Sequence, residues 1–71
     1  MRQALIEILE HQVVTPQQAA IELRERLGSD VTVFEARANL EQLAIDGYAE
    51  RLTPRKGMTH YSAPSGGGYD P

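Results

Sequence analysis

The chain has 71 residues and no cysteine, and its 7 lysines and arginines against 10 aspartates and glutamates give a net charge of −3. This length allows one small domain, and the lack of cysteine excludes a disulfide framework and a thiolate metal site. The acidic balance argues against a protein that coats nucleic acid by bulk attraction. Because no apolar run approaches the ~20 residues that span a bilayer and no signal-peptide pattern is present, we expect a cytoplasmic protein that does not enter a membrane.

The first predicted element is a helix over residues 2–11, where apolar side chains recur at helical spacing and the glutamates face outward. Val13 and Val14 follow it as an extended apolar pair. We expect this pair to form a short strand between the first and second helices.

A second helix is predicted to begin at Thr15-Pro16, because a threonine oxygen caps free N–H groups and proline is well tolerated at the first helical position. Gly28 is placed to end this helix after Leu27, because glycine readily adopts the left-handed conformation. About four residues separate this helix from the next one, which is the helix-turn-helix arrangement.

Thr32 and Glu35 have the T-x-x-E spacing of a capping box and predict that a third helix starts near residue 33. Gly47 is expected to end it. The inward face of this helix is predicted to carry five apolar side chains at helical spacing, namely Val33, Ala36, Leu40, Leu43 and Ala44.

Two alternating runs, residues 48–53 and 58–63, flank a turn that contains proline and glycine, and this pattern predicts a β-hairpin. Residues 65–71 have too little apolar content to offset the entropy of ordering them, and we expect a flexible glycine-rich tail there. The predicted fold is therefore α+β, with three helices, a C-terminal hairpin and a short strand between helices 1 and 2, in one domain over residues 1–64.

This order of elements resembles the winged helix-turn-helix superfamily. Two segments carry the resemblance, Val13-Val14-Thr15-Pro16 before the second helix and Leu40-Glu41-Gln42-Leu43-Ala44-Ile45-Asp46-Gly47-Tyr48 at the end of the third. The second segment is similar to the L-x-x-L-x-x-x-G-hydrophobic pattern of small MarR-like bacterial regulators. The resemblance implies that the third helix enters the major groove of double-stranded DNA and that the hairpin, or wing, lies along the phosphate backbone.

The candidate DNA-binding residues lie on the third helix and the hairpin. Asn39 and Gln42 present paired donors and acceptors that suit an adenine edge, or they are ordinary helix surface. The cations of the hairpin contact phosphates, or they keep its edge soluble and free of strand pairing. Arg37 joins the phosphate contacts or pairs with Glu41 four residues later. The full candidate set is Arg37, Asn39, Gln42, Arg51, Arg55, Lys56 and His60.

A second surface consists of Phe34, Ala38 and Ile45, which fall together on the third helix away from its predicted inward face. If these side chains are exposed they indicate a protein partner. The interpretation we favour at this point is that the second helix covers Phe34 and the hairpin covers Ile45. Ile6 lies off the inward face of the first helix and suggests a homodimer through that helix.

Catalysis is not indicated, because the chain has no nucleophile elbow and no phosphate-binding loop. His11 and His60 lack the spacing of a helical metal pair, so we expect no metal and no cofactor. The leading hypothesis is a small DNA-binding regulator of transcription. The alternative is a winged helix that binds a protein through the acidic and apolar face of its third helix.

Overall fold

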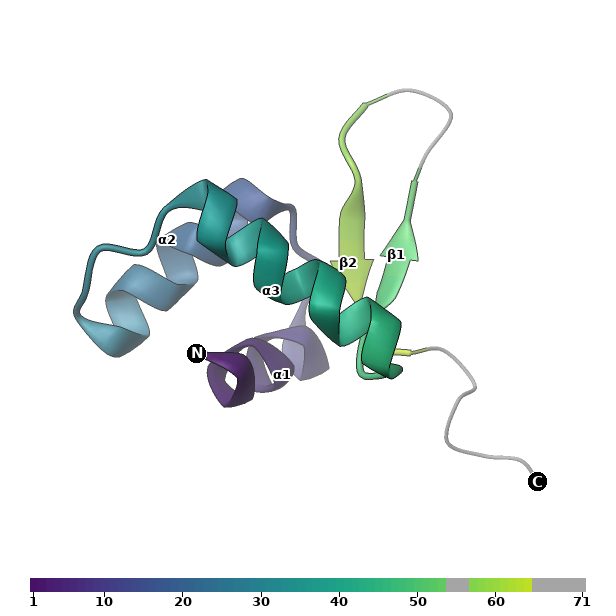
Figure 1. The fold of residues 1–71 in the computed structure, drawn as a ribbon, viewed down its shortest axis with the longest axis horizontal. Coiled ribbons are helices and arrows are strands. Elements are labelled where there is room, and N and C mark those ends of the chain that lie inside the picture. The colour runs from purple at the N-terminus through teal and green to yellow at the C-terminus, as the bar shows by residue number, and fades with distance from the viewer. Residues whose placement is uncertain (54–56, 65–71) are drawn as a thin grey trace.

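The computed structural model describes residues 1–53 and 57–64, and within them it has an α+β fold of three helices and one two-stranded antiparallel sheet (Figure 1). In chain order the elements are α1 (Arg2–His11), α2 (Pro16–Leu27), α3 (Val33–Asp46), β1 (Glu50–Leu52) and β2 (His60–Ser62). The predicted class, the three helices and the hairpin are confirmed. Arg55, Lys56 and the predicted tail over residues 65–71 lie outside the described residues.

Helix α2 begins and ends as its sequence predicts. The hydroxyl oxygen of Thr15 accepts a hydrogen bond from the backbone N–H of Gln18 at 3.2 Å, and Pro16 occupies the start of the helix. Gly28 ends α2 in the left-handed conformation, with φ of 67°, and its N–H donates to the carbonyl of Arg24. The chain turns there and enters α3 five residues later, at Val33.

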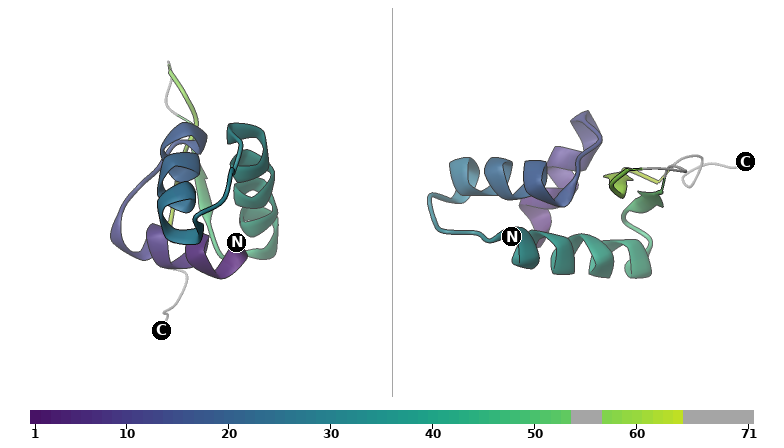
Figure 2. Two further views of the ribbon diagram at one scale, coloured as in Figure 1. Left: turned by 90° about the vertical axis from the view of Figure 1, so that its left-hand side faces the viewer. Right: turned by 90° about the horizontal axis from the view of Figure 1, so that it is seen from above.

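Helix α3 has the predicted capping box. The N–H of Glu35 donates to the Thr32 hydroxyl oxygen at 3.0 Å, and the Glu35 carboxylate accepts from the Thr32 N–H at 3.0 Å. Gly47 ends the helix with φ of 88°. Viewed from above in Figure 2, α3 runs alongside α2, and the hairpin lies at the end where α3 finishes. The caps therefore fix the length of the helix that the other elements pack around.

The core lies between the three helices and is closed by Tyr61 from β2, which is only 1% exposed. Three of the five predicted inward residues of α3 are buried, whereas Val33 is exposed and Ala44 is half-buried at the edge of the packed face. Ile6 packs against the core and is half-buried. The buried residues are Leu5, Ile8, Leu9, Val14, Ala19, Ala20, Leu23, Val31, Ala36, Leu40, Leu43, Ala49 and Tyr61.

The predicted strand between α1 and α2 is wrong, because the described chain has a single isolated bridge there. Val14 and Tyr61 exchange two backbone hydrogen bonds, with N···O distances of 3.0 and 2.7 Å. The pairing does not extend toward α2, because Thr15 is already the cap and Pro16 has no N–H. On the other side the N–H of Gln12 donates to Ile8 and completes α1. The bridge nevertheless ties this connection to the sheet.

The hairpin strands are shorter than the alternating runs that predicted them. Three residue pairs face each other, Glu50 with Ser62, Arg51 with Tyr61 and Leu52 with His60. Tyr61 points into the core from this sheet. Among the described residues, no helix is long and apolar enough to cross a membrane.

Candidate interaction surface

The outward face of α3 carries an exposed apolar stripe, which we define as Phe34, Ala38 and Ile45. Phe34 is 80% exposed, Ile45 is 72% exposed, and Ala38 between them is also exposed. The interpretation that α2 and the hairpin cover this stripe is therefore wrong. Both elements pack elsewhere, because the buried residues of α3 lie on the opposite side of the helix.

Glu41, beside the outward stripe, joins α3 to both strands of the hairpin. Arg51 on β1 donates from Nε and Nη2 to the two carboxylate oxygens of Glu41 at 3.0 and 2.6 Å. The hydroxyl of Tyr61 on β2 donates to Oε2 of the same carboxylate. These hydrogen bonds, first that of Arg51 and then that of Tyr61, lower the pKa of Glu41. Burial raises the pKa of Tyr61, and its bond to Glu41 raises it further.

This cluster changes the interpretation of two predicted phosphate contacts. The guanidinium of Arg51 makes a two-point contact with the carboxylate of Glu41, so a phosphate would have to compete with that carboxylate for it. Arg37 makes no ion pair or hydrogen bond with Glu41 or with any other residue that the structure describes. Its charge still acts on Glu41 from a distance and adds a small lowering of the pKa of that carboxylate.

The two predicted base-reading amides also have internal partners. The amide nitrogen of Asn39 donates to the backbone carbonyl of Glu35 at 2.9 Å, and its side chain is half-buried. The amide nitrogen of Gln42 donates to Asp46 at 3.2 Å, and Asp46 also accepts from Arg2 at 2.9 Å. Arg2 in turn lies over the ring of Tyr48, 5.1 Å from its centroid. The amide nitrogens of both Asn39 and Gln42 are therefore engaged within the chain.

Of the remaining DNA-binding candidates on the hairpin, the structure describes only His60. His60 is half-buried, and its Nδ1 lies 2.9 Å from the carbonyl of Met58, a contact in which the ring nitrogen donates. Arg55 and Lys56 belong to the turn that the structure does not describe. In the described part, no group of three or more histidines or acids is placed to hold a metal ion.

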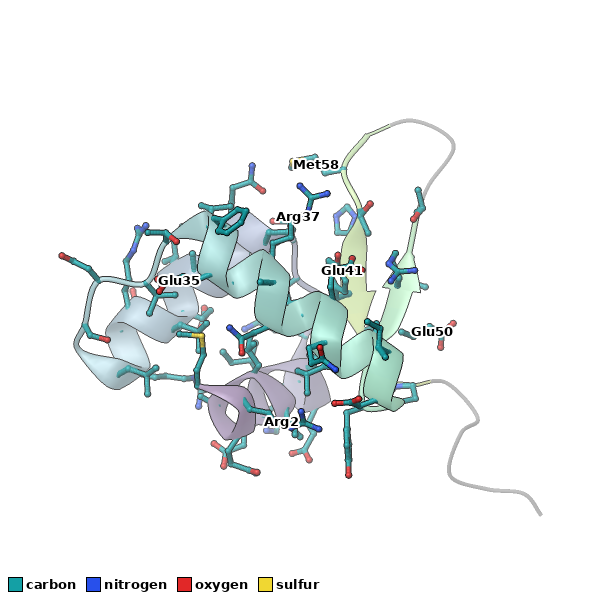
Figure 3. The ribbon with its side chains drawn as sticks, in the orientation of Figure 1. Arg2, Glu35, Arg37, Glu41, Glu50 and Met58 are labelled. Carbon is teal, nitrogen blue, oxygen red and sulfur yellow. The ribbon has the colours of Figure 1, made fainter. Side chains whose placement is uncertain are left out.

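A groove of about 700 Å³ separates the hairpin-facing flank of α3 from the hairpin itself. The first residues of α2 close one end of it, and its walls include Val33, Arg37 and Glu41 from α3 and Arg51, Met58 and Tyr61 from the hairpin segment. Figure 3 shows Arg37, Glu41 and Met58 on this side of α3. The sequence interpretation missed the groove, because its walls come from α2, α3 and the hairpin, and the way these elements pack against one another is not visible in any local pattern.

Comparison of the chain with protein-family models, with curated proteins and with solved structures found no match.

Proposed function

We propose that the chain is a small winged-helix domain that binds another protein through the outward stripe of α3. The order of elements supports the winged-helix assignment: α2 and α3 are joined by a short turn that follows Gly28, and an antiparallel hairpin follows α3 directly. The winged helix is thus proposed as a scaffold, and α3 supplies its contact face.

The observation that carries this proposal is the exposure of Phe34 and Ile45, at 80% and 72%. These side chains lie 11 positions apart, about 16 Å along the helix at ~1.5 Å per residue, with Ala38 between them. Fully burying a large apolar side chain contributes about 1.5–3 kcal/mol, and the isolated domain gains only a small part of this at the two positions. A protein partner that covers the stripe gains that free energy.

The test is quantitative affinity purification from the cells that produce the chain. The double variant Phe34→Ser/Ile45→Ser removes the stripe, whereas Val13→Ser/Ile21→Ser removes two apolar side chains that are 51% and 46% exposed outside α3. We expect a protein that co-purifies with the wild type and with the Val13/Ile21 variant to be lost from the Phe34/Ile45 variant. Equal recovery with both double variants would reject the stripe as the contact surface.

DNA binding is the second candidate function, and the observation that favours it is exposed Arg37 beside the hairpin, which has no ion-pair partner among the residues that the structure describes. In the sequence, two further cations, Arg55 and Lys56, stand between the two segments that form the hairpin strands. If these three cations contact phosphates, the logarithm of duplex affinity falls with the logarithm of salt concentration at a slope of about −3.

An anisotropy titration of a labelled duplex at low salt tests this second function. The wild type should bind, Arg37→Ala should bind more weakly, and an Arg55→Ala/Lys56→Ala variant should lose further affinity. No binding of the wild type at low salt would remove the DNA hypothesis.

A further inference from the structure

Arg37 is unusual among the charged residues of α3 because all the acids of this helix have partners inside the chain. The carboxylate of Glu35 accepts from Thr32, that of Glu41 accepts from Arg51 and Tyr61, and that of Asp46 accepts from Arg2. Arg37 has no hydrogen-bond or ion-pair partner in the part of the chain that the structure describes. Glu41 and Asp46 are paired with arginines, so two charges of α3 lack an ion-pair partner among the described residues. One is Arg37, which lines the groove beside the hairpin, and the other is Glu35, which accepts from neutral groups of Thr32 and does not line the groove.

Apolar side chains surround this cation. Val33 lies four positions before Arg37 and Phe34 three positions before it, so both lie near Arg37 on the helix surface. Val33 and Met58 line the groove with Arg37, and they are 37% and 51% exposed. The groove is thus bordered by a cation and by apolar groups, with Phe34 next to its rim.

The charges inside the groove leave it positive. Among the described residues, Arg37 and Arg51 line the groove against one acid, Glu41, so this part of the lining has one net positive charge. Because Arg51 and Tyr61 already occupy the Glu41 carboxylate, that acid repels an incoming anion only weakly. The volume of about 700 Å³ is in the range of pockets that hold small ligands or a few side chains.

From these observations we infer that the groove binds an acidic, apolar peptide segment of a partner protein. A carboxylate of the segment binds the guanidinium of Arg37, and an adjacent apolar side chain packs against Val33 and Met58 while the segment covers Phe34. This inference rests on the proposed protein-binding function and adds the chemistry of the partner. Arginine suits such a contact because its guanidinium binds a carboxylate through two parallel hydrogen bonds.

The apolar surroundings of Arg37 favour a peptide over a nucleic-acid backbone. A phosphate gains nothing from Val33, Phe34 and Met58, whereas a peptide that alternates acids with leucine or phenylalanine satisfies the cation and covers the apolar groups. A second copy of this chain offers a poorer match through α3, because two of the three acids of that helix, Glu41 and Asp46, are already paired with arginines of the same chain.

The experiment is selection of a phage-displayed random dodecapeptide library on the immobilised chain. Wild type should enrich peptides with aspartate or glutamate next to large apolar residues, and Arg37→Glu should enrich peptides with lysine or arginine in place of the acids. Arg26→Glu is the control for charge reversal, because Arg26 is an exposed arginine of α2 outside the groove, and its ion pair with Glu7 at 3.6 Å lies outside the groove as well. Its enriched peptides should remain acidic. No enrichment, or acidic peptides from Arg37→Glu as well, would overturn the inference.

The affinity of one synthetic peptide from the wild-type selection is then measured for the wild type and for variants of the groove. Arg37→Ala should weaken its binding by about tenfold, equivalent to about 1.4 kcal/mol, and Met58→Ser should also weaken it. A peptide that loses affinity with Phe34→Ser but not with Arg37→Ala leaves the protein-binding function standing and rejects the groove. Arg37-dependent binding of duplex DNA without peptide enrichment would assign the cation to nucleic acid, and a dimer in sedimentation that Phe34→Ser dissociates would assign the stripe to a second copy.

Discussion

Arg51 of β1 binds both carboxylate oxygens of Glu41, which lies ten residues earlier in α3, at 3.0 and 2.6 Å. Tyr61 of β2 donates to the same carboxylate, so one side chain of α3 contacts both strands of the hairpin. These contacts hold the hairpin against α3. Because Glu41, Arg51 and Tyr61 also line the groove, the same contacts determine its shape.

The first prediction concerns acid. Because Arg51 and Tyr61 lower the pKa of Glu41 below its ordinary value of 4.5, the Glu41 contacts stabilise the fold at and above that pH. Their contribution is lost as the pH falls through the lowered pKa. Urea unfolding should therefore show that Glu41→Gln is less stable than the wild type at pH 7, and that the difference shrinks near pH 2. An equal difference at both pH values would contradict the role of the ionised carboxylate.

The second prediction separates the two roles of Tyr61. Tyr61→Phe keeps the ring and removes the hydroxyl that binds Glu41, so we expect a loss of about 1 kcal/mol in the free energy of unfolding. Tyr61→Ala empties a site that is 1% exposed and should cost about 3–5 kcal/mol. Thermal unfolding followed by circular dichroism measures both losses. Similar losses in the two variants would mean that the ring does not close the core.

The third prediction compares two apolar residues of α3. Phe34 is 80% exposed and phenylalanine and serine have similar helix propensities, so Phe34→Ser should change the free energy of unfolding by no more than about 0.5 kcal/mol. Leu40 is fully buried, and Leu40→Ala should cost about 2–5 kcal/mol. Denaturant titrations of both variants provide the comparison. A large loss for Phe34→Ser would show that this ring belongs to the core.

The fourth prediction concerns the start of α3. Thr32→Ala removes the oxygen that accepts from the N–H of Glu35 and should cost about 1 kcal/mol. Ser29→Ala, in the same turn but outside the capping box, should cost less. The midpoints of the urea unfolding transitions of the two variants are compared with that of the wild type. A larger shift for Ser29→Ala than for Thr32→Ala would disprove the capping role of Thr32.

The helix ends could be predicted because their causes are local. Thr15, Thr32, Gly28 and Gly47 act on backbone groups within four residues, and the sequence displays those neighbours directly. The strand at Val14 failed for a tertiary reason, since its pairing depends on Tyr61 and stops after one bridge. The alternating pattern predicted the hairpin correctly, but it predicted strands that are longer than the three residue pairs that the structure contains.

The candidate site was only partly predictable. Helical periodicity placed Phe34 and Ile45 on one side of α3, but whether other elements cover that side depends on how α2 and the hairpin pack. The sequence suggested a local pair between Arg37 and Glu41, whereas the fold brings Arg51 to Glu41 from the next element. Because Arg51 occupies Glu41, Arg37 has no ion-pair partner in the described part of the chain, and no spacing rule anticipates this outcome.

The central claim is that the outward stripe of α3 contacts another protein. Photocrosslinking in the cells that naturally produce the chain tests it most directly. Benzoylphenylalanine replaces Phe34 in one variant and, as the control, Ile21 of α2 in another. Irradiation should give a covalent adduct with a distinct protein from position 34 and none of that adduct from position 21. An equal yield from both positions, or no protein adduct from position 34, would contradict the account.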